Sequence, residues 1–168
     1  MLNLKPTVTF SNRDISTSNS LPNLLTENII IKKIDSILEI EACIILSKKP
    51  EIKCVLGELE KKDFSDYIEG LVIIKNGKVI GWRTYYNADD GIINGILYAI
   101  DPEYWGTGVS KTLLLKWIEL LKKENKKRIE VMVNSKNTHS LNRLKSVGFS
   151  IDYIEQGSSS ITYLSLNL

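Results

Sequence analysis

The fold is decided by one stretch of sequence at residues 100–111, Ile100-Asp101-Pro102-Glu103-Tyr104-Trp105-Gly106-Thr107-Gly108-Val109-Ser110-Lys111. Residues 92–100 lead into it and are rich in strand-forming side chains, while residues 112–123 follow it with apolar side chains at helical spacing. Gly106 and Gly108 stand at this junction, where glycine allows backbone conformations closed to other residues. Because the first N–H groups of a helix have no intrahelical partner, such a turn presents several donors and a positive dipole end to one anion. We predict a phosphate-binding loop that fits a pyrophosphate.

The loop matches neither of the two common nucleotide motifs. The spacing Gly-x-x-x-x-Gly-Lys-Ser/Thr is absent, and Gly106-Thr107-Gly108 lacks a third glycine at Lys111. A glycine pair before a helix also serves ordinary strand-to-helix turns. A ligand of this loop is therefore expected to be another nucleotide-bearing molecule.

A second block follows at residues 128–149. Residues 128–133, Arg128-Ile129-Glu130-Val131-Met132-Val133, have the pattern of a strand, and residues 137–149 run from Asn137 through a short helical stretch to Gly148-Phe149. Together with residues 98–114, this block resembles the GNAT superfamily of acyl-CoA-dependent N-acyltransferases. The signature of that family is a strand, a proline two residues beyond it, a Gln/Arg-x-x-Gly-x-Gly/Ala loop and a helix that begins on the loop. The resemblance extends over residues 28–166 and is specific from 97 to 149.

The resemblance implies an α/β (α+β) fold with a mixed, mostly antiparallel sheet of six to seven strands, a splayed parallel pair at its centre and helices on both faces. Residues 28–168 form the domain, and residues 1–27 are a polar arm or an extra edge strand. The implied activity is an N-acetyltransferase that moves an acetyl group from acetyl-CoA directly to a primary amine, on a small molecule, a protein N-terminus or a lysine. Acetyl-CoA is the expected co-substrate, and no metal is expected.

The resemblance also assigns the CoA contacts. It places the pyrophosphate on the loop and the helix start, the pantetheine arm along the main chain of Tyr98 and Ile100, and a polar contact at Asn137. The implied CoA-binding residues are Tyr98, Ile100, Trp105, Gly106, Thr107, Gly108, Val109, Ser110, Lys111, Asn137 and Ser140. Asn137 is equally well placed to cap the helix that begins at Thr138.

Three positions depart from the family pattern. Trp105 stands where Arg or Gln is usual, and Ser110 replaces Gly or Ala, which leaves the backbone donors in place. Leu144 stands where many members carry a tyrosine that protonates the departing thiolate, and a leucine cannot donate a proton. A second hypothesis is therefore a non-catalytic acyl-CoA sensor or interaction module on the same fold.

Catalysis requires a neutral amine and hydrogen-bond donors for the developing oxyanion. We name Tyr98, Asp101 and Glu69 as candidate bases, with the alternative that Asp101 orders the loop before Pro102. His139, the single histidine, is expected to be merely exposed in the first turn of a helix. No covalent intermediate is expected, because neither cysteine lies near the loop in sequence.

Composition limits the remaining function classes. The chain has 168 residues and a formal net charge of +2, from 22 basic and 20 acidic side chains, so bulk electrostatics does not direct it to nucleic acid. The basic run at residues 122–128 keeps a third hypothesis open, a nucleic-acid-modifying enzyme of the same fold, although such a run usually faces water. Cys43 and Cys54 form no disulfide framework, which favours the reducing cytoplasm. Residues 1–27 lack the apolar core of a signal peptide or membrane span. The expected partners are acyl-CoA and an amine acceptor, and a homodimer is left open.

The coarse element pattern agrees with this fold. Residues 28–34 are a strand, and Asp35-Ser36 with Glu39 predict a capped helix that stops before Pro50. A second short helix is expected near Lys62 to Glu69. Strands at 70–74 and 78–86 flank the turn Lys75-Asn76-Gly77, and the strand 92–100 should run parallel to 129–133 because a helix connects them. Residues 150–154 and 160–166 predict a final hairpin, after a left-handed helix end at Gly148.

Overall fold

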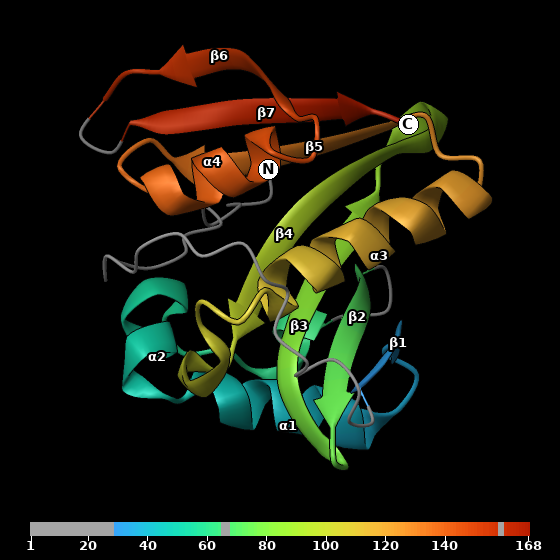
Figure 1. Ribbon diagram of the computed structural model, residues 1–168, viewed down its shortest axis with the longest axis vertical. Coiled ribbons are helices and arrows are strands. Elements are labelled where there is room, and N and C mark those ends of the chain that lie inside the picture. Colours follow the sequence, from blue (N-terminus) through green and yellow to red (C-terminus); the bar gives the residue numbers. More distant parts are fainter. Residues whose placement is uncertain (1–28, 65–67, 158–159) are drawn as a thin grey trace.

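The computed structural model describes residues 29–64, 68–157 and 160–168, so the predicted arm at residues 1–27 lies outside the described part. Within that part, seven strands form one sheet in the order β1-β2-β3-β4-β5-β7-β6 (Figure 1). The strands are β1 Ile29–Lys33, β2 Ile68–Lys75, β3 Lys78–Asn87, β4 Ile92–Ile100, β5 Arg128–Asn134, β6 Ser150–Glu155 and β7 Ile161–Asn167. The helices are α1 Ile37–Ser47, α2 Pro50–Leu56, α3 Val109–Lys123 and α4 Thr138–Lys145, with short 3-10 turns at Lys61–Phe64, Asp89–Gly91 and Pro102–Tyr104.

The predicted sheet is confirmed, because β4 and β5 pair in parallel and the other described strand pairs are antiparallel. Helix α3 connects the two parallel strands as a crossover (Figure 1). β7 lies between β5 and β6, so the last hairpin adds to the sheet through its second strand. The pair β4–β5 consequently occupies the middle of the sheet.

Helix α1 begins as predicted at a side-chain cap. The Ser36 hydroxyl accepts a hydrogen bond from the Glu39 N–H at 3.3 Å, and the Glu39 carboxylate accepts one from the Asp35 N–H at 3.0 Å. These bonds satisfy donors that a helix start leaves open, and a cap of this kind contributes about 1 kcal/mol. The helix ends at Ser47, before Pro50, also as predicted.

The helix predicted near Lys62 to Glu69 is wrong. The second helix is α2, which Pro50 itself starts, and Lys61–Phe64 forms only a 3-10 turn. Ile68 and Glu69 already belong to β2 and pair with β3. Proline lacks an N–H and has its φ angle preset, so it ends one helix and also suits the first position of the next. The prediction used only the first of these two properties.

The turn between β2 and β3 is the predicted tight hairpin. Asn76 and Gly77 both have positive φ angles, 50° and 76°. That combination defines the turn type whose twist matches the twist of the flanking strands. The hairpin fixes the register of β3, which carries several side chains of the site described below.

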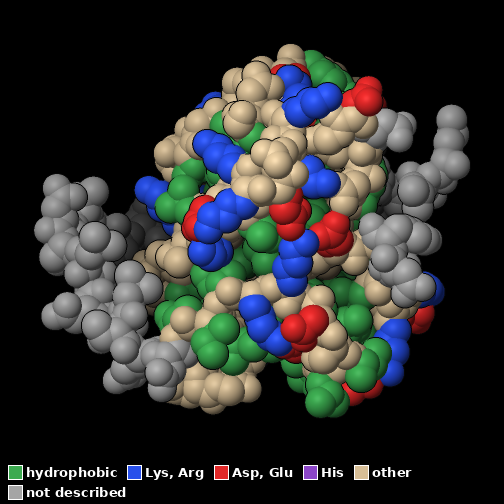
Figure 2. Space-filling model, turned by 90° about the vertical axis from the view of Figure 1, so that its right-hand side faces the viewer, with side chains coloured by type: hydrophobic (Ala, Val, Ile, Leu, Met, Phe, Trp, Pro, Cys, Tyr) green, Lys and Arg blue, Asp and Glu red, His purple; other side chains and the backbone are tan. Residues whose placement is uncertain are grey.

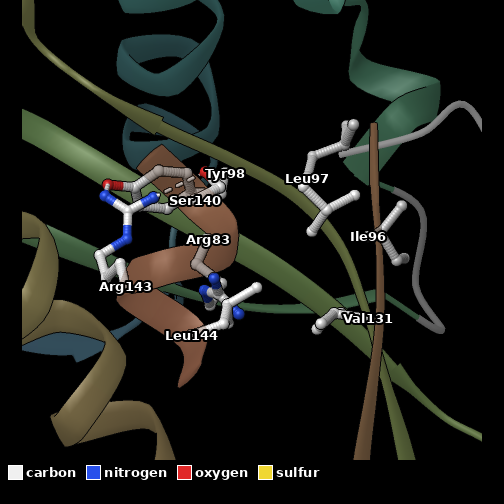
Figure 3. A pocket seen from close by; sticks show the side chains of 10 residues that line it. Arg83, Ile96, Leu97, Tyr98, Val131, Ser140, Arg143 and Leu144 are labelled. Atoms are coloured by element: carbon white, nitrogen blue, oxygen red, sulfur yellow. Dashed lines mark hydrogen bonds between the residues drawn. The ribbon is translucent and has the colours of Figure 1, made fainter. Parts of the chain in front are cut away.

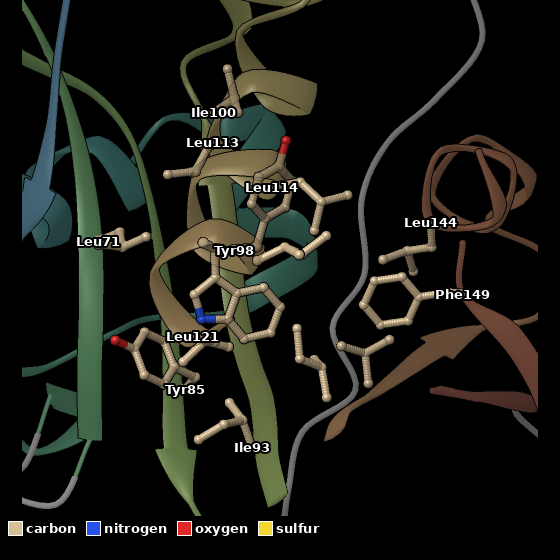
Figure 4. Packing of buried hydrophobic residues seen from close by; sticks show 14 of the residues in the cluster. Leu71, Tyr85, Ile93, Tyr98, Ile100, Leu113, Leu114, Leu121, Leu144 and Phe149 are labelled. Atoms are coloured by element: carbon tan, nitrogen blue, oxygen red, sulfur yellow. The ribbon is translucent and has the colours of Figure 1, made fainter. Parts of the chain in front are cut away.

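Helices cover both faces of the sheet, as predicted. On one face α3 packs through Trp117, which is fully buried and lies 5.6 Å from the Tyr85 ring. Figure 4 shows this cluster, in which Leu144 and Phe149 approach from the far side of the β4–β5 gap. On the other face α1 and α2 cover Trp82, which meets Phe64 at 5.4 Å. Each side of the sheet thus has one buried tryptophan at its centre. Replacing such a side chain by alanine lowers the free energy of unfolding by about 3–5 kcal/mol.

A β-bulge separates the two parallel strands. β4 pairs with β5 only from Ile92 to Gly95, and at the next step two residues of β4, Ile96 and Leu97, lie opposite Thr84 of β3. The Thr84 hydroxyl accepts a hydrogen bond from the Leu97 N–H at 3.2 Å. Because an extra residue bends the strand that contains it, β4 turns away from β5 beyond Gly95. The predicted splayed pair is therefore present, and the bulge explains where it opens.

Candidate functional site

The predicted phosphate loop leads directly into α3. Gly106 and Gly108 have φ angles of 77° and 86°, and no atom of the described residues around them lies within 4 Å of the place where a side chain would begin. Their need for glycine is therefore conformational rather than a matter of space. Among the described residues, no side chain caps the N-terminus of α3. The first N–H groups of the helix thus stay available to an anion.

The main chain of β4 faces the gap at the two predicted positions. The Asp101 N–H donates to the Ile80 carbonyl at 2.8 Å, so Ile100 and its partner Gly81 do not exchange main-chain hydrogen bonds. In an antiparallel ladder, hydrogen-bonded and non-hydrogen-bonded residue pairs alternate. Tyr98 lies two residues before Ile100, so its pair with Arg83 is also a non-hydrogen-bonded pair. The N–H and carbonyl groups of Tyr98 and Ile100 therefore point away from β3 and toward the gap.

Trp105 replaces the usual polar residue of the loop and takes a structural position. Its indole Nε1 donates to the Ile100 carbonyl at 2.9 Å, while 39% of the residue stays exposed. The indole thereby holds the loop against the end of β4. Thr107 in the same loop donates its hydroxyl hydrogen to the Tyr104 carbonyl at 2.7 Å. Lys111 is exposed on the first turn of α3.

Asp101 is buried and belongs to an ion-pair network at the base of the loop. Its carboxylate accepts from Lys49 at 2.6 Å and from the Glu103 N–H at 3.2 Å, and Lys78 lies 3.6 Å away. Burial acts to raise the pKa of Asp101, but the bonds from Lys49 and Glu103 outweigh it and hold that pKa below its ordinary value. These bonds support the interpretation that the Asp101 carboxylate orders the loop before Pro102.

Glu69 lies far from the phosphate loop. Its carboxylate accepts from Lys33 at 3.0 Å, Tyr85 at 3.3 Å and Asn87 at 2.6 Å. Lys33 also pairs with Glu124 at 2.7 Å, just beyond the C-terminal end of α3. The loop stands at the other end of this 15-residue helix, which is about 22 Å long. Glu69 lines neither of the pockets described next.

A narrow pocket of about 20 Å³ fills the gap between β4 and β5 on the face covered by α3 and α4 (Figure 3). That volume holds roughly one water-sized group. The pocket is lined by Arg83, Gly95, Ile96, Leu97, Tyr98, Val131, Val133, Ser140, Arg143 and Leu144. The lining joins predicted CoA contacts to two arginines that sequence reasoning missed.

Arg143 ties α4 to the start of α3. Its Nη1 donates to the Tyr98 hydroxyl at 3.2 Å and to the Ser110 hydroxyl, and its Nη2 donates to the Ser140 hydroxyl at 3.0 Å. The Tyr98 hydroxyl also contacts Ser110. The structure thus brings three predicted residues together around one guanidinium at the mouth of the gap.

Arg83 is the other arginine of the pocket, and only 7% of it is exposed. Its guanidinium stacks on Trp117 at 4.2 Å and on Tyr98 at 5.4 Å. Its Nε atom is buried and has no hydrogen-bond partner among the residues that the structure describes. Burial lowers the pKa of Arg83 to about 10, so the side chain remains charged at neutral pH.

Asn137 and His139 lie at the start of α4. The Asn137 side chain accepts from the Ser140 N–H at 3.1 Å, so this residue caps the helix, and it is buried beside the pocket. His139 is exposed and lines neither pocket, as expected for a first-turn histidine. Gly148 ends the helix with a φ of 102°, while the Phe149 N–H donates to the Leu144 carbonyl at 3.2 Å.

A larger groove of about 550 Å³ opens on the opposite face of the same gap. It is lined by Tyr86, Asn94, Gly95, Ile96, Arg128, Glu130, Val131, Met132, Asp152, Tyr153, Tyr163 and Leu164. Tyr153 and Tyr163 stack with ring centroids 4.2 Å apart. Gly95, Ile96 and Val131 line both the groove and the narrow pocket. The two spaces therefore lie on opposite sides of the same three residues, where β4 leaves β5.

The two missed arginines did leave signals in the sequence. Arg83 is a charged residue inside the apolar strand Trp82-Arg83-Thr84-Tyr85, where a buried charge needs a reason. Arg143 follows Ser140 by three residues, which places both on one side of a helix. Neither signal identifies a pocket without the tertiary structure.

Two of the five basic side chains in the run at residues 122–128 pair with carboxylates. Lys123 contacts Glu119 at 2.6 Å, and Arg128 contacts Glu130 and Asp152 at 3.0 Å each. Over the face seen in Figure 2, basic and acidic side chains lie interspersed. These pairs support the interpretation of the run as a solvated surface rather than a nucleic-acid contact.

No group of three or more His, Cys, Asp or Glu side chains that could hold a metal occurs in residues 29–64, 68–157 and 160–168. Within the same ranges, none of the helices has the length and apolar character required to cross a membrane. Cys43 is buried and Cys54 exposed, and both are free thiols.

Solved structures of similar fold are numerous. The ribosomal-protein-S18-alanine N-acetyltransferase of Escherichia coli is 16% identical, with a TM-score of 0.73 over 83% of this chain and 94% of that one. A Bacillus subtilis acetyltransferase solved in complex with CoA is 18% identical, with a TM-score of 0.65 over 84% and 99%. Ard1 of Thermoplasma volcanium is 16% identical, with a TM-score of 0.68 over 83% and 97%. At these identities the likeness establishes the fold.

No curated protein sequence matches the chain significantly. The sequence model of the acetyltransferase (GNAT) family matches residues 39–149, which include the bulge, the phosphate loop and both walls of the gap. This match spans well over half of the chain. The chain therefore belongs to the GNAT acetyltransferase family.

Proposed function

We propose that this protein transfers an acetyl group from acetyl-CoA directly to the nitrogen of a primary amine. The observation that carries the proposal is that two pockets on opposite faces of the sheet share Gly95, Ile96 and Val131 in their linings. A donor on the α3 and α4 face and an acceptor in the opposite groove reach each other only there. Direct transfer needs such a shared opening, because both substrates must be bound at once.

On the donor side, the pyrophosphate binds the main chain of the loop and the start of α3. The residues that hold it are Gly106, Thr107, Gly108, Val109, Ser110 and Lys111, with Trp105 keeping the loop in place. The pantetheine arm follows the gap-facing main chain of Tyr98 and Ile100, and the second wall contributes Asn137 and Ser140. This arrangement presents the thioester at the closed end of the gap.

On the acceptor side, the groove combines tyrosine rings with the carboxylates of Glu130 and Asp152, which share the single cation Arg128 and so keep a net negative charge. Aromatic faces and carboxylates both attract an ammonium group. The amine must lose its proton before it attacks, since alkyl amines are mostly protonated near pH 7. We propose Tyr98 before Asp101 and Glu69 as the group that assists, because only Tyr98 lines the gap. The acceptor is a small molecule, a protein N-terminus or a lysine in the cytoplasm.

Binding and turnover test the proposal separately. Calorimetry with acetyl-CoA should give a saturable heat, and a panel of amines and peptides should release CoA thiol with at least one member. The matched control is Gly106→Val, which forces a β-branched residue into a positive φ and should abolish the heat. The absence of binding at millimolar acetyl-CoA would count against the whole proposal.

A second candidate function rests on Leu144. This side chain lines the donor pocket and cannot supply a proton, which favours a non-catalytic acyl-CoA sensor. That candidate predicts tight CoA binding with no thiol release across the amine panel.

A further inference from the structure

The donor pocket has an unusual charge balance. Arg83 and Arg143 both line it, and no carboxylate of the described residues does. Arg143 is satisfied by three hydroxyl groups. Arg83, in contrast, has no hydrogen bond or ion pair within the described part of the chain, where its guanidinium lies over the rings of Tyr98 and Trp117. Burying a cation without a counter-charge is costly, and ring faces return only a part of that cost. The buried guanidinium of Arg83 is therefore expected to serve a function that requires a positive charge in the donor pocket.

The guanidinium of Arg83 lies at the closed end of the gap. Gly95 and Val131 form the last pair that joins β4 to β5. A side chain built on Gly95 would begin 3.5 Å from the Arg83 Nη1 atom and 3.0 Å from Val131. The missing side chain at Gly95 therefore leaves the guanidinium open to the apex, where the thioester of the proposed donor arrives.

We propose that Arg83 donates its guanidinium N–H groups to the sulfur of CoA as acetyl transfer turns that sulfur into a thiolate. The inference rests on the proposed function. The amine nitrogen forms a bond to the thioester carbon, the carbon–sulfur bond breaks, and its electron pair leaves on sulfur. The nitrogen gives up a proton to solvent, and the thiolate later takes one up. Arg83 stabilises the charge between these two events and is a catalytic residue by contact with the leaving atom.

Two kinds of anion could neutralise Arg83. One is a carboxylate at the end of a longer acyl chain, and the other is the thiolate sulfur of CoA. The acetyl donor of the proposed function carries no carboxylate, so its sulfur is the atom that becomes anionic beside Arg83. Leu144 lines the same space and cannot protonate the thiolate. The positive charge of Arg83 then stabilises the thiolate in place of a proton donor.

The thiol of bound CoA provides a test that needs no acceptor. Thiolate absorbance is followed against pH for CoA bound to the wild-type protein, with desulfo-CoA as the blank. A guanidinium beside the sulfur should lower the pKa of the bound thiol by about one unit or more, a tenfold change in the thiol–thiolate equilibrium. In Arg83→Met that pKa should return to the value in free CoA.

Arg143→Met is the matched control, because this arginine lines the same pocket and packs on the same tyrosine. It should weaken CoA binding and leave most of the thiol shift in place. Equal thiol pKa values in the wild type and Arg83→Met would overturn the inference, and so would a shift that disappears only in Arg143→Met. CoA that binds with an unshifted thiol refutes the role of Arg83 alone, whereas CoA that does not bind refutes the proposed function as well.

A second measurement avoids variants altogether, in case Arg83→Met does not fold. In the wild type, the affinity for CoA relative to desulfo-CoA should rise as pH increases through the pKa of the bound thiol, by about tenfold for a one-unit shift. A ratio that stays constant from pH 6 to 10 would overturn the inference.

Discussion

The guanidinium of Arg143 donates to the hydroxyl of Tyr98 at 3.2 Å and stacks over the same ring at 5.0 Å. This contact joins α4 to β4 across the gap that the β-bulge opens. Both residues stand where a ligand would enter, so the two walls of the gap are connected by a polar bridge rather than by apolar packing. A bridge of this kind can be exchanged for contacts with phosphate.

Replacing Arg143 by methionine should weaken the binding of acetyl-CoA. Hydrogen bonds made by a charged group contribute about 1.5–3 kcal/mol each, and part of that is recovered by water, so a tenfold loss of affinity is expected. Calorimetry measures the change. Lys145→Met removes an exposed charge from the same helix outside both pockets and should leave affinity unchanged within about twofold.

Replacing Thr84 by valine should disturb the bulge. The substitution keeps the shape but removes the acceptor of the buried Leu97 N–H, which costs about 1–3 kcal/mol. Urea unfolding measures this loss. Thr84→Ser keeps the hydroxyl, so it should cost less than Thr84→Val, and the reverse order would contradict this account of the bulge.

Replacing Gly95 by alanine should close the apex of the gap. The added methyl group would lie 3.0 Å from Val131 and 3.1 Å from the Trp117 ring, and crowding of that kind costs about 1–3 kcal/mol. We expect lower stability by thermal unfolding and a larger loss in acetyl transfer than in affinity for CoA. A methyl group on Gly157 would have no described residue within 4 Å, so Gly157→Ala is the neutral control.

Asp101 should make the protein sensitive to acid. Its folded-state pKa is depressed, so its contribution to stability is complete above the unfolded-state pKa and is lost as pH falls through the lower folded-state pKa. In urea titrations, wild-type stability should therefore decline below about pH 4, while Asp101→Asn lacks this part of the decline. At pH 7 the free energy of unfolding of the variant should be lower by about 1–3 kcal/mol. This is less than the loss of a fully buried ion pair would cost, because Lys49 is partly exposed and water screens the pair. A variant as stable as the wild type at pH 7 would exclude a structural role for the ion pair.

The sequence predicted those features of the fold that depend on local pattern. Asn76-Gly77 predicts a tight hairpin because both positions tolerate positive φ, and the helix between β4 and β5 requires these strands to be parallel. The helix boundaries near Pro50 are not determined by local pattern, because a proline can either end a helix or begin one. Local sequence pattern therefore predicts the order and direction of the strands, whereas the ends of some helices depend on tertiary contacts.

The site was predictable only in part. Gly106 and Gly108 are recognisable from the sequence as a loop before a helix. The resemblance to the GNAT superfamily indicates that the main chain of Tyr98 and Ile100 faces the gap. Arg83 and Arg143 lie 60 residues apart in the chain, and only the register of β3 on β4 places the first opposite Tyr98. The partners of Arg83 are the faces of aromatic rings rather than a carboxylate. A single sequence contains no pattern that identifies such a contact.

The position of Trp105 also makes the loop optically addressable. Trp82 and Trp117 are fully buried, while Trp105 is 39% exposed and is bonded to the end of β4. A collisional quencher in solution will therefore reach one of the three indoles, so quenching of the intrinsic fluorescence reports on the phosphate loop alone. Occupancy of that loop can be followed without a label, in the same cuvette as the chemistry.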